Sequence, residues 1–159
     1  IGRTYRTSTI RDVGEGEGPA FGADGEYTWP NSLDVTGWDV EDDGLRAVLS
    51  ADIPALARGE MRGVTTEFLG RHGLDLAAVE HFICHPGGTK VLAALEEALE
   101  LGTGTLAHSR GVLRDFGNMS GVTVLFVLDR ALRAGAGGRL LLSTLGPGFT
   151  AAFQLLEAA

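Results

Sequence analysis

Apolar and polar residues alternate along the chain with two different periods. Segments of period two, typical of strands, are separated by segments in which apolar residues recur every three or four positions, as on one face of a helix. Strands that alternate with helices predict an α/β fold in which helices cover a mixed sheet. The pattern predicts strands over 3–10, 35–40, 45–49, 80–84, 139–144 and 149–157, and helices over 90–101, 107–115, 122–133 and from 54 to 70 or 73.

Turn and capping residues support these boundaries. Asp-Asp-Gly at 42–44 is typical of the turn between two hairpin strands. Asp52 is expected to cap the first helix, and Ser120 is expected to cap the last one. Gly-Pro-Gly at 146–148 predicts the bend that joins the two final strands.

Two predicted helices differ in the distribution of their apolar residues. The helix over 90–101 is amphipathic, and Glu96, Glu97 and Glu100 are expected on the side opposite its apolar residues. The helix over 122–133 is apolar nearly all the way round, so we expect it to be buried between layers.

The chain divides into two unequal parts. Residues 1–32 combine the first predicted strand with an exposed loop rich in glycine and glutamate, whereas 33–159 hold the remaining elements and form one domain. The chain begins with Ile1 instead of methionine, which indicates a fragment or a processed protein.

Composition narrows the class of protein. Hydrophobic residues make up 44% of the chain, with 24 glycines and 5 prolines, a mixture typical of a folded domain. The formal net charge of -8 disfavours nucleic-acid binding. A single cysteine, Cys84, excludes an intramolecular disulfide and a thiolate zinc site and favours a cytoplasmic location. No apolar run reaches the roughly 18 to 20 residues of a membrane span.

Two polar segments lie where predicted elements end or begin. His85-Pro86-Gly87-Gly88 follows a strand, and Gly117-Asn118-Met119-Ser120 precedes the last helix. Strand ends and helix N-termini are common ligand sites in α/β proteins. An imidazole and a carboxamide are suitable donors to a thioester enolate, and removing one such donor costs about 3 to 4 kcal/mol of barrier.

These segments carry a specific resemblance. The strings at 82–88, 116–120 and 145–149, in this order and spacing, resemble the C-terminal half of type III polyketide synthases of the chalcone synthase kind. Residues 37–40 and 45–54 are similar to the bacterial members, so the resemblance runs from about Leu33 onward. It implies the C-terminal half of a thiolase-like fold, in which two similar halves pack with the active site between them.

The resemblance also implies roles for individual residues. His85 matches the histidine that activates the nucleophilic thiol and hydrogen-bonds the thioester carbonyl, and Asn118 matches the asparagine that helps to stabilise the enolate. Gly88 and Lys90 match positions near the CoA arm, although Lys90 is also an ordinary charged residue of a solvated first helical turn. The positions that match the lining of the condensation cavity are Ala47, Ser120, Leu145, Gly146, Pro147 and Gly148.

The implied activity is decarboxylative Claisen condensation of malonyl-CoA onto an acyl-CoA starter, followed by cyclisation, in a homodimer without a cofactor other than the CoA thioesters. Ala47 and Leu145 are smaller than their plant counterparts, which favours a fatty-acyl starter, as in bacterial alkylresorcinol or alkylpyrone synthases. The family nucleophile belongs to an N-terminal half absent from this sequence, so we expect the chain alone to be inactive. The alternatives are a ketoacyl-carrier-protein synthase III-like enzyme, which is expected to lack Pro-Gly-Gly after the histidine, and a non-catalytic structural or dimerisation module.

Other reactive or aromatic residues are interpreted structurally. Cys84 and His85 are neighbours on a strand, so their side chains point to opposite faces and Cys84 is expected to be a buried structural cysteine. Trp29 and Trp38 are expected to be packing anchors. The remaining histidines lack metal-ligand spacing; they are His72, His81 and His108.

Overall fold

The computed structural model describes residues 18–159. The strand predicted over 3–10 lies outside the described residues, and the division predicted between residues 32 and 33 stays a prediction. None of the helices within the described range has the length and apolar character needed to cross a membrane.

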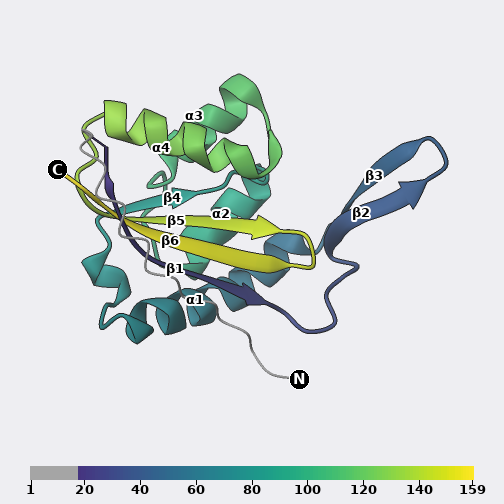
Figure 1. Ribbon diagram of the computed structural model, residues 1–159, viewed down its shortest axis with the longest axis horizontal. Coiled ribbons are helices and arrows are strands. Elements are labelled where there is room, and N and C mark those ends of the chain that lie inside the picture. The colour runs from purple at the N-terminus through teal and green to yellow at the C-terminus, as the bar shows by residue number, and fades with distance from the viewer. Residues whose placement is uncertain (1–17) are drawn as a thin grey trace.

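A four-stranded mixed sheet forms the centre of the domain (Figure 1). Its strands are β1 (Ala20–Thr28), β4 (His81–Cys84), β5 (Gly138–Gly146) and β6 (Thr150–Ala158). They lie in the order β1-β6-β5-β4; β4 runs parallel to β5, and the other pairs are antiparallel. The mixed sheet predicted from the sequence is therefore confirmed.

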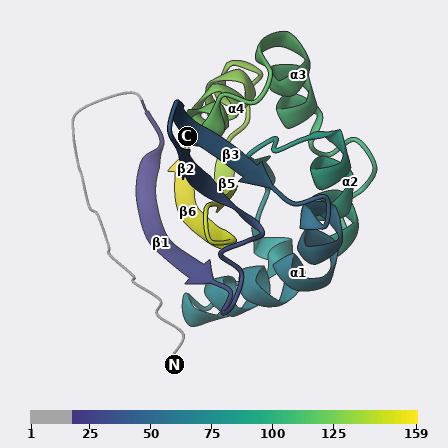
Figure 2. The ribbon, with the colours of Figure 1, turned by 90° about the vertical axis from the view of Figure 1, so that its right-hand side faces the viewer.

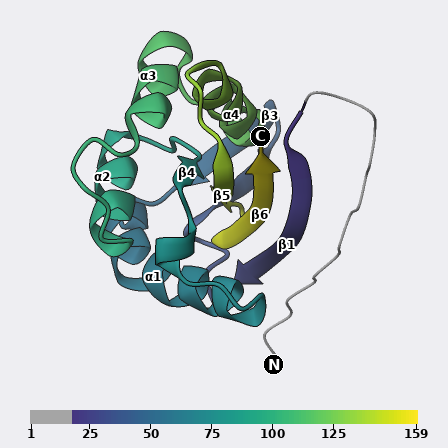
Figure 3. The same cartoon turned by 90° about the vertical axis from the view of Figure 1, so that its left-hand side faces the viewer.

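Helices cover both faces of this sheet. They are α1 (Ile53–Arg71), α2 (Thr89–Ala98), α3 (Ala107–Phe116) and α4 (Thr123–Arg133). One core joins α1 and α2 to residues such as Cys84, Leu141 and Phe153, whereas the other joins α3 and α4 to residues such as Ile83 and Leu142. Figure 3 shows β4 beside α2, at the opposite edge of the sheet from β1, and Figure 2 shows β1 on the side of the domain away from α2.

A separate hairpin projects beyond the β5–β6 turn (Figure 1). It consists of β2 (Thr36–Glu41) and β3 (Gly44–Leu49), as predicted from the turn residues. Trp38 pairs with Ala47 and Val40 pairs with Leu45, so apolar side chains share one face. The other face is polar, because Arg46 forms ion pairs with Asp39 and Glu41. The hairpin is thus an amphipathic arm.

The two predicted helix caps differ in outcome. Asp52 occupies the N-cap position of α1, as predicted, but it has helical backbone angles and its side chain makes no cap hydrogen bond within residues 18–159. Ser120 does not cap α4. Ser120 has a φ of 63° and begins a short 3-10 turn, η2 (Ser120–Val122). The Thr123 hydroxyl instead ties this turn to the start of α4: its Oγ1 accepts from the Met119 N–H at 2.9 Å and donates to the Ser120 carbonyl at 2.6 Å.

Two predictions about helix faces are also wrong. The segment 122–133 is not buried all round, because Leu125 and Phe126 are 54% and 42% exposed while the opposite side of α4 packs on the sheet. Glu96 does not face solvent; it is 6% exposed between α2 and α3. In each case the helical period identified the helix, but not the neighbours that would cover it.

Candidate active site

His85 lies immediately after β4, as predicted. Its N–H donates to the Ser143 carbonyl of β5 at 2.8 Å, so the ladder continues one residue past the strand. Pro86 has no N–H with which to extend this pairing, and the Gly87 N–H turns back to the His85 carbonyl at 3.0 Å. The turn leaves His85 at the carboxyl end of β4.

Burial determines the charge of this imidazole. His85 is 8% exposed, and its Nδ1 has no hydrogen-bond partner among residues 18–159. Burial lowers the pKa of His85, because the charged form loses its hydration. At neutral pH the ring is therefore neutral, with one nitrogen able to donate and the other able to accept.

The pH dependence of stability should report this burial. An unfolded histidine binds a proton below about pH 6.5 whereas folded His85 resists it, so the free energy of unfolding should fall as pH drops below that value. Urea unfolding at about pH 7.5 and about pH 5.5 measures this fall. His85→Gln should show a smaller fall than the unmodified chain, because glutamine binds no proton in either state. An equal fall in both proteins would contradict the assignment.

Asn118 approaches the same region from the other side. Gly117, with a φ of 74°, ends α3, and Asn118 follows it. The Asn118 Oδ1 accepts from the Ser120 N–H at 2.9 Å, and its Nδ2 lies 3.4 Å from the Gly87 carbonyl. The amide thus links the start of η2 to the loop after β4. Asn118 and His85 come from separate elements, and the Asn118 amide reaches the loop that begins at His85.

Two cavities adjoin this pair, and His85 and Asn118 line both of them. The first has a volume of about 410 Å³ and includes Gly88 and Lys90 in its wall. The second has a volume of about 560 Å³. Its wall includes five positions named from the sequence, which are Ala47, Ser120, Leu145, Gly146 and Pro147. The imidazole and the carboxamide therefore lie where the two cavities meet.

The structure separates Gly148 from this group. The Gly148 N–H donates to the Thr36 carbonyl at 2.7 Å, which attaches the β5–β6 turn to the hairpin. Thr36 and Leu49 line both cavities, although the sequence reasoning missed them. Strand alternation could have identified them, since both belong to the face of the hairpin that carries Ala47.

The two tryptophans have different environments. Trp29 packs as predicted, with its ring centroid 4.6 Å from that of Phe149 and its Nε1 donating to Glu60 at 3.0 Å. Trp38 is 56% exposed and lines the second cavity, so its interpretation as a packing anchor is wrong. An aromatic residue on a projecting arm has few neighbours to bury it.

Cys84 is buried, as expected. It is fully inaccessible, and its Sγ accepts from the Ser143 Oγ at 3.3 Å. Burial raises the pKa of the Cys84 thiol to about 11, and the nearby Glu96 carboxylate adds to this effect. The thiol is therefore protonated at neutral pH and is not a thiolate nucleophile.

The fold matches that of a bacterial type III polyketide synthase of known structure. The crystal structure of 1,3,6,8-tetrahydroxynaphthalene synthase from Streptomyces coelicolor, a bacterial type III polyketide synthase, superposes with a TM-score of 0.83 and 31% identity. The match covers 90% of this chain and 42% of that one. The chain belongs to the chalcone and stilbene synthases, since residues 25–157 match the C-terminal domain of that family.

Sequence relatives agree with this assignment. The 1,3,6,8-tetrahydroxynaphthalene synthase of Streptomyces peucetius is 41% identical over 144 residues, which span 87% of this chain and 38% of that protein. The 3,5-dihydroxyphenylacetyl-CoA synthase of Amycolatopsis balhimycina is 30% identical, over 94% of this chain and 42% of that protein. The predicted family and thiolase-like fold class are confirmed. The chain spans about two fifths of the length of these relatives.

Proposed function

We propose that this chain forms the C-terminal half of a type III polyketide synthase, which condenses malonyl-CoA with an acyl-CoA starter and cyclises the product. The observation that carries the proposal is the position of a buried neutral imidazole and a carboxamide at the junction of two cavities. Family membership supports this reaction over that of a ketoacyl-carrier-protein synthase III.

The two side chains would act on a thioester carbonyl. As the bond between the malonyl methylene and its carboxylate breaks, carbon dioxide leaves and the electron pair forms an enolate. Hydrogen bonds from the His85 imidazole and the Asn118 amide would stabilise the negative enolate oxygen. The enolate carbon then bonds to the acyl carbonyl carbon of the starter, and the starter's thiolate departs.

The two cavities suit different parts of such substrates. Lys90 is an exposed cation in the wall of the first cavity, which suits the phosphates of a CoA arm. The second cavity is walled by the apolar face of the hairpin, including Trp38 and Ala47, which suits an acyl or polyketide chain. The fatty-acyl starter expected from the small Ala47 and Leu145 is part of this proposal.

The thiol that carries the starter would come from the N-terminal half of a longer protein, in the homodimer expected of this family. Cys84, the single cysteine of the sequence, is unsuitable because its thiol is buried and protonated.

Product formation tests the proposal. The full-length protein, given malonyl-CoA and acyl-CoA starters of increasing chain length, should release carbon dioxide, free CoA and a polyketide. The 159-residue chain alone should give no triketide pyrone under the same conditions, because it has no reactive thiol. Pyrone made by the chain alone would contradict this account, and a full-length protein inactive with every starter would support the non-catalytic alternative.

A further inference from the structure

One peptide group at the end of β4 is held from both sides. It joins Cys84 to His85. Its N–H, which belongs to His85, donates to the Ser143 carbonyl at 2.8 Å, and its C=O, which belongs to Cys84, accepts from the Ser109 Oγ at 2.7 Å. Hydrogen bonds in opposite directions fix the plane of this peptide group. They thereby fix the backbone from which the imidazole projects.

The bond from Ser109 compensates for the position of β4 in the sheet. In the order of the described strands β4 is at one end, so backbone groups that point away from β5 have no neighbouring strand. The Cys84 carbonyl is such a group, and it is buried. Ser109, 1% exposed on α3, supplies the missing donor. A buried carbonyl left without a donor is destabilising, because it loses its hydration and gains no hydrogen bond in return.

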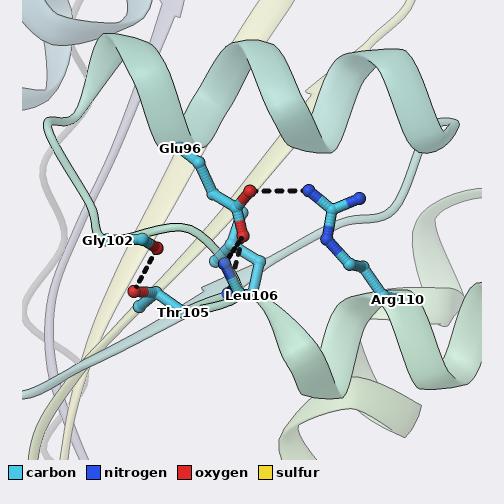
Figure 4. A network of polar contacts seen from close by, with 6 residues as sticks. Glu96, Gly102, Thr105, Leu106 and Arg110 are labelled. Carbon is cyan, nitrogen blue, oxygen red and sulfur yellow. Dashed lines mark hydrogen bonds and ion pairs between the residues drawn. The ribbon is translucent and has the colours of Figure 1, made fainter.

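The start of α3 is itself fixed by Glu96 of α2 (Figure 4). The Glu96 Oε1 accepts from the N–H groups of Gly104 and Leu106 at 3.1 and 3.2 Å. The other carboxylate oxygen accepts from the Arg110 guanidinium at 2.6 Å. These bonds hold the first turn of α3 on α2, and Ser109 is in that turn.

The opposite end of α3 leads to Asn118. The helix ends at Phe116, and only Gly117 intervenes. One rigid element therefore holds the peptide group before His85 through Ser109 and carries Asn118 at its far end. A shift of α3 along β4 would change the distance between the imidazole and the carboxamide.

We propose that Ser109 is a positioning residue, through which α3 sets the separation of His85 and Asn118. This inference rests on the proposed function, since it concerns how those two groups are aligned on one carbonyl. In the full-length enzyme, Ser109→Ala should lower kcat about tenfold to a hundredfold, because small displacements of reacting groups have effects of that size. KM for malonyl-CoA should change less than about twofold, because no cavity residue is altered.

Rescue and control variants make the test specific. Ser109→Thr keeps the hydroxyl and should restore kcat to within about threefold. Thr105→Ala is the matched control. The Thr105 hydroxyl also donates at 2.7 Å, but to the Gly102 carbonyl and not to β4, so its removal should leave kcat unchanged. Ser109→Cys replaces the hydroxyl with a weak donor of similar size and should give an intermediate kcat. This variant takes the place of Ser109→Ala if the alanine variant does not fold.

The outcomes separate this inference from the proposed function. If His85→Ala abolishes turnover while Ser109→Ala retains normal kcat, the inference fails and the function stands. If Thr105→Ala lowers kcat as much as Ser109→Ala does, the effect is not specific to the β4 peptide and the inference also fails. Normal turnover in His85→Ala would overturn both. A kcat loss confined to Ser109→Ala and rescued by threonine supports the inference.

Discussion

Replacing His85 by alanine in the full-length protein is expected to lower the rate of malonyl-CoA decarboxylation by about a thousandfold. The variant loses a donor that is already buried, neutral and aimed from a rigid strand end, so no other described group replaces it without rearrangement. Asn118→Ala should lower the rate by about a hundredfold, because its amide is more exposed and the imidazole remains. Release of labelled carbon dioxide measures both rates.

A matched histidine controls for general effects of the substitution. His81 lies at the other end of β4, four residues before His85 in the sequence, and lines neither of the two cavities beside Asn118. His81→Ala should decarboxylate malonyl-CoA at nearly the normal rate. Near-normal decarboxylation in both His85→Ala and Asn118→Ala would refute their proposed roles, provided circular dichroism shows that the variants are folded.

The position of His85 could be predicted because it depends on local chemistry. A short apolar run followed by Pro86 must end a strand, and the residue between them must emerge at the strand's carboxyl end. The hairpin was predictable for a similar reason, because Asp-Asp-Gly favours a tight turn and the flanking residues alternate. In both places neighbouring residues in the sequence determine the outcome.

Strand β1 could not be predicted in this way. Its sequence contains two glycines and few β-branched residues, so its intrinsic preference for a strand is weak. It forms because its backbone pairs with β6, from Ala20 opposite Glu157 to Thr28 opposite Thr150, with one irregularity between Phe21 and Asp24. The partner is more than a hundred residues away, and only the tertiary fold brings it near.

The second cavity also depends on contacts distant in sequence. Its wall combines the hairpin, the turn after β5 and the start of η2. Trp38 was interpreted as a packing residue because large aromatic side chains are usually buried. The arm that carries Trp38 projects from the domain, and its cavity-facing side is defined only once Gly148 binds the Thr36 carbonyl.

Glu96→Ala is expected to reduce the free energy of unfolding of this chain by about 3 to 5 kcal/mol, a large part of a typical domain's stability. Burial alone would raise the pKa of Glu96, but bonds from Arg110 and from the Leu106 and Gly104 N–H groups lower it overall. The carboxylate is therefore charged when folded. Removing it leaves the Arg110 guanidinium and two N–H groups at the start of α3 without their acceptor (Figure 4).

The adjacent glutamate provides the matched control for urea unfolding. Glu97 pairs with Arg58 at the surface, where the two side chains are 62% and 45% exposed, so Glu97→Ala should cost less than about 1 kcal/mol. Glu96→Gln keeps one acceptor oxygen but loses the charge, and should lie between the two alanine variants. The Glu96 contribution should also decline in acid, because a carboxyl with a lowered pKa loses its stabilising effect as pH falls through that value. Equal losses from Glu96→Ala and Glu97→Ala would show that the buried carboxylate does not anchor α3.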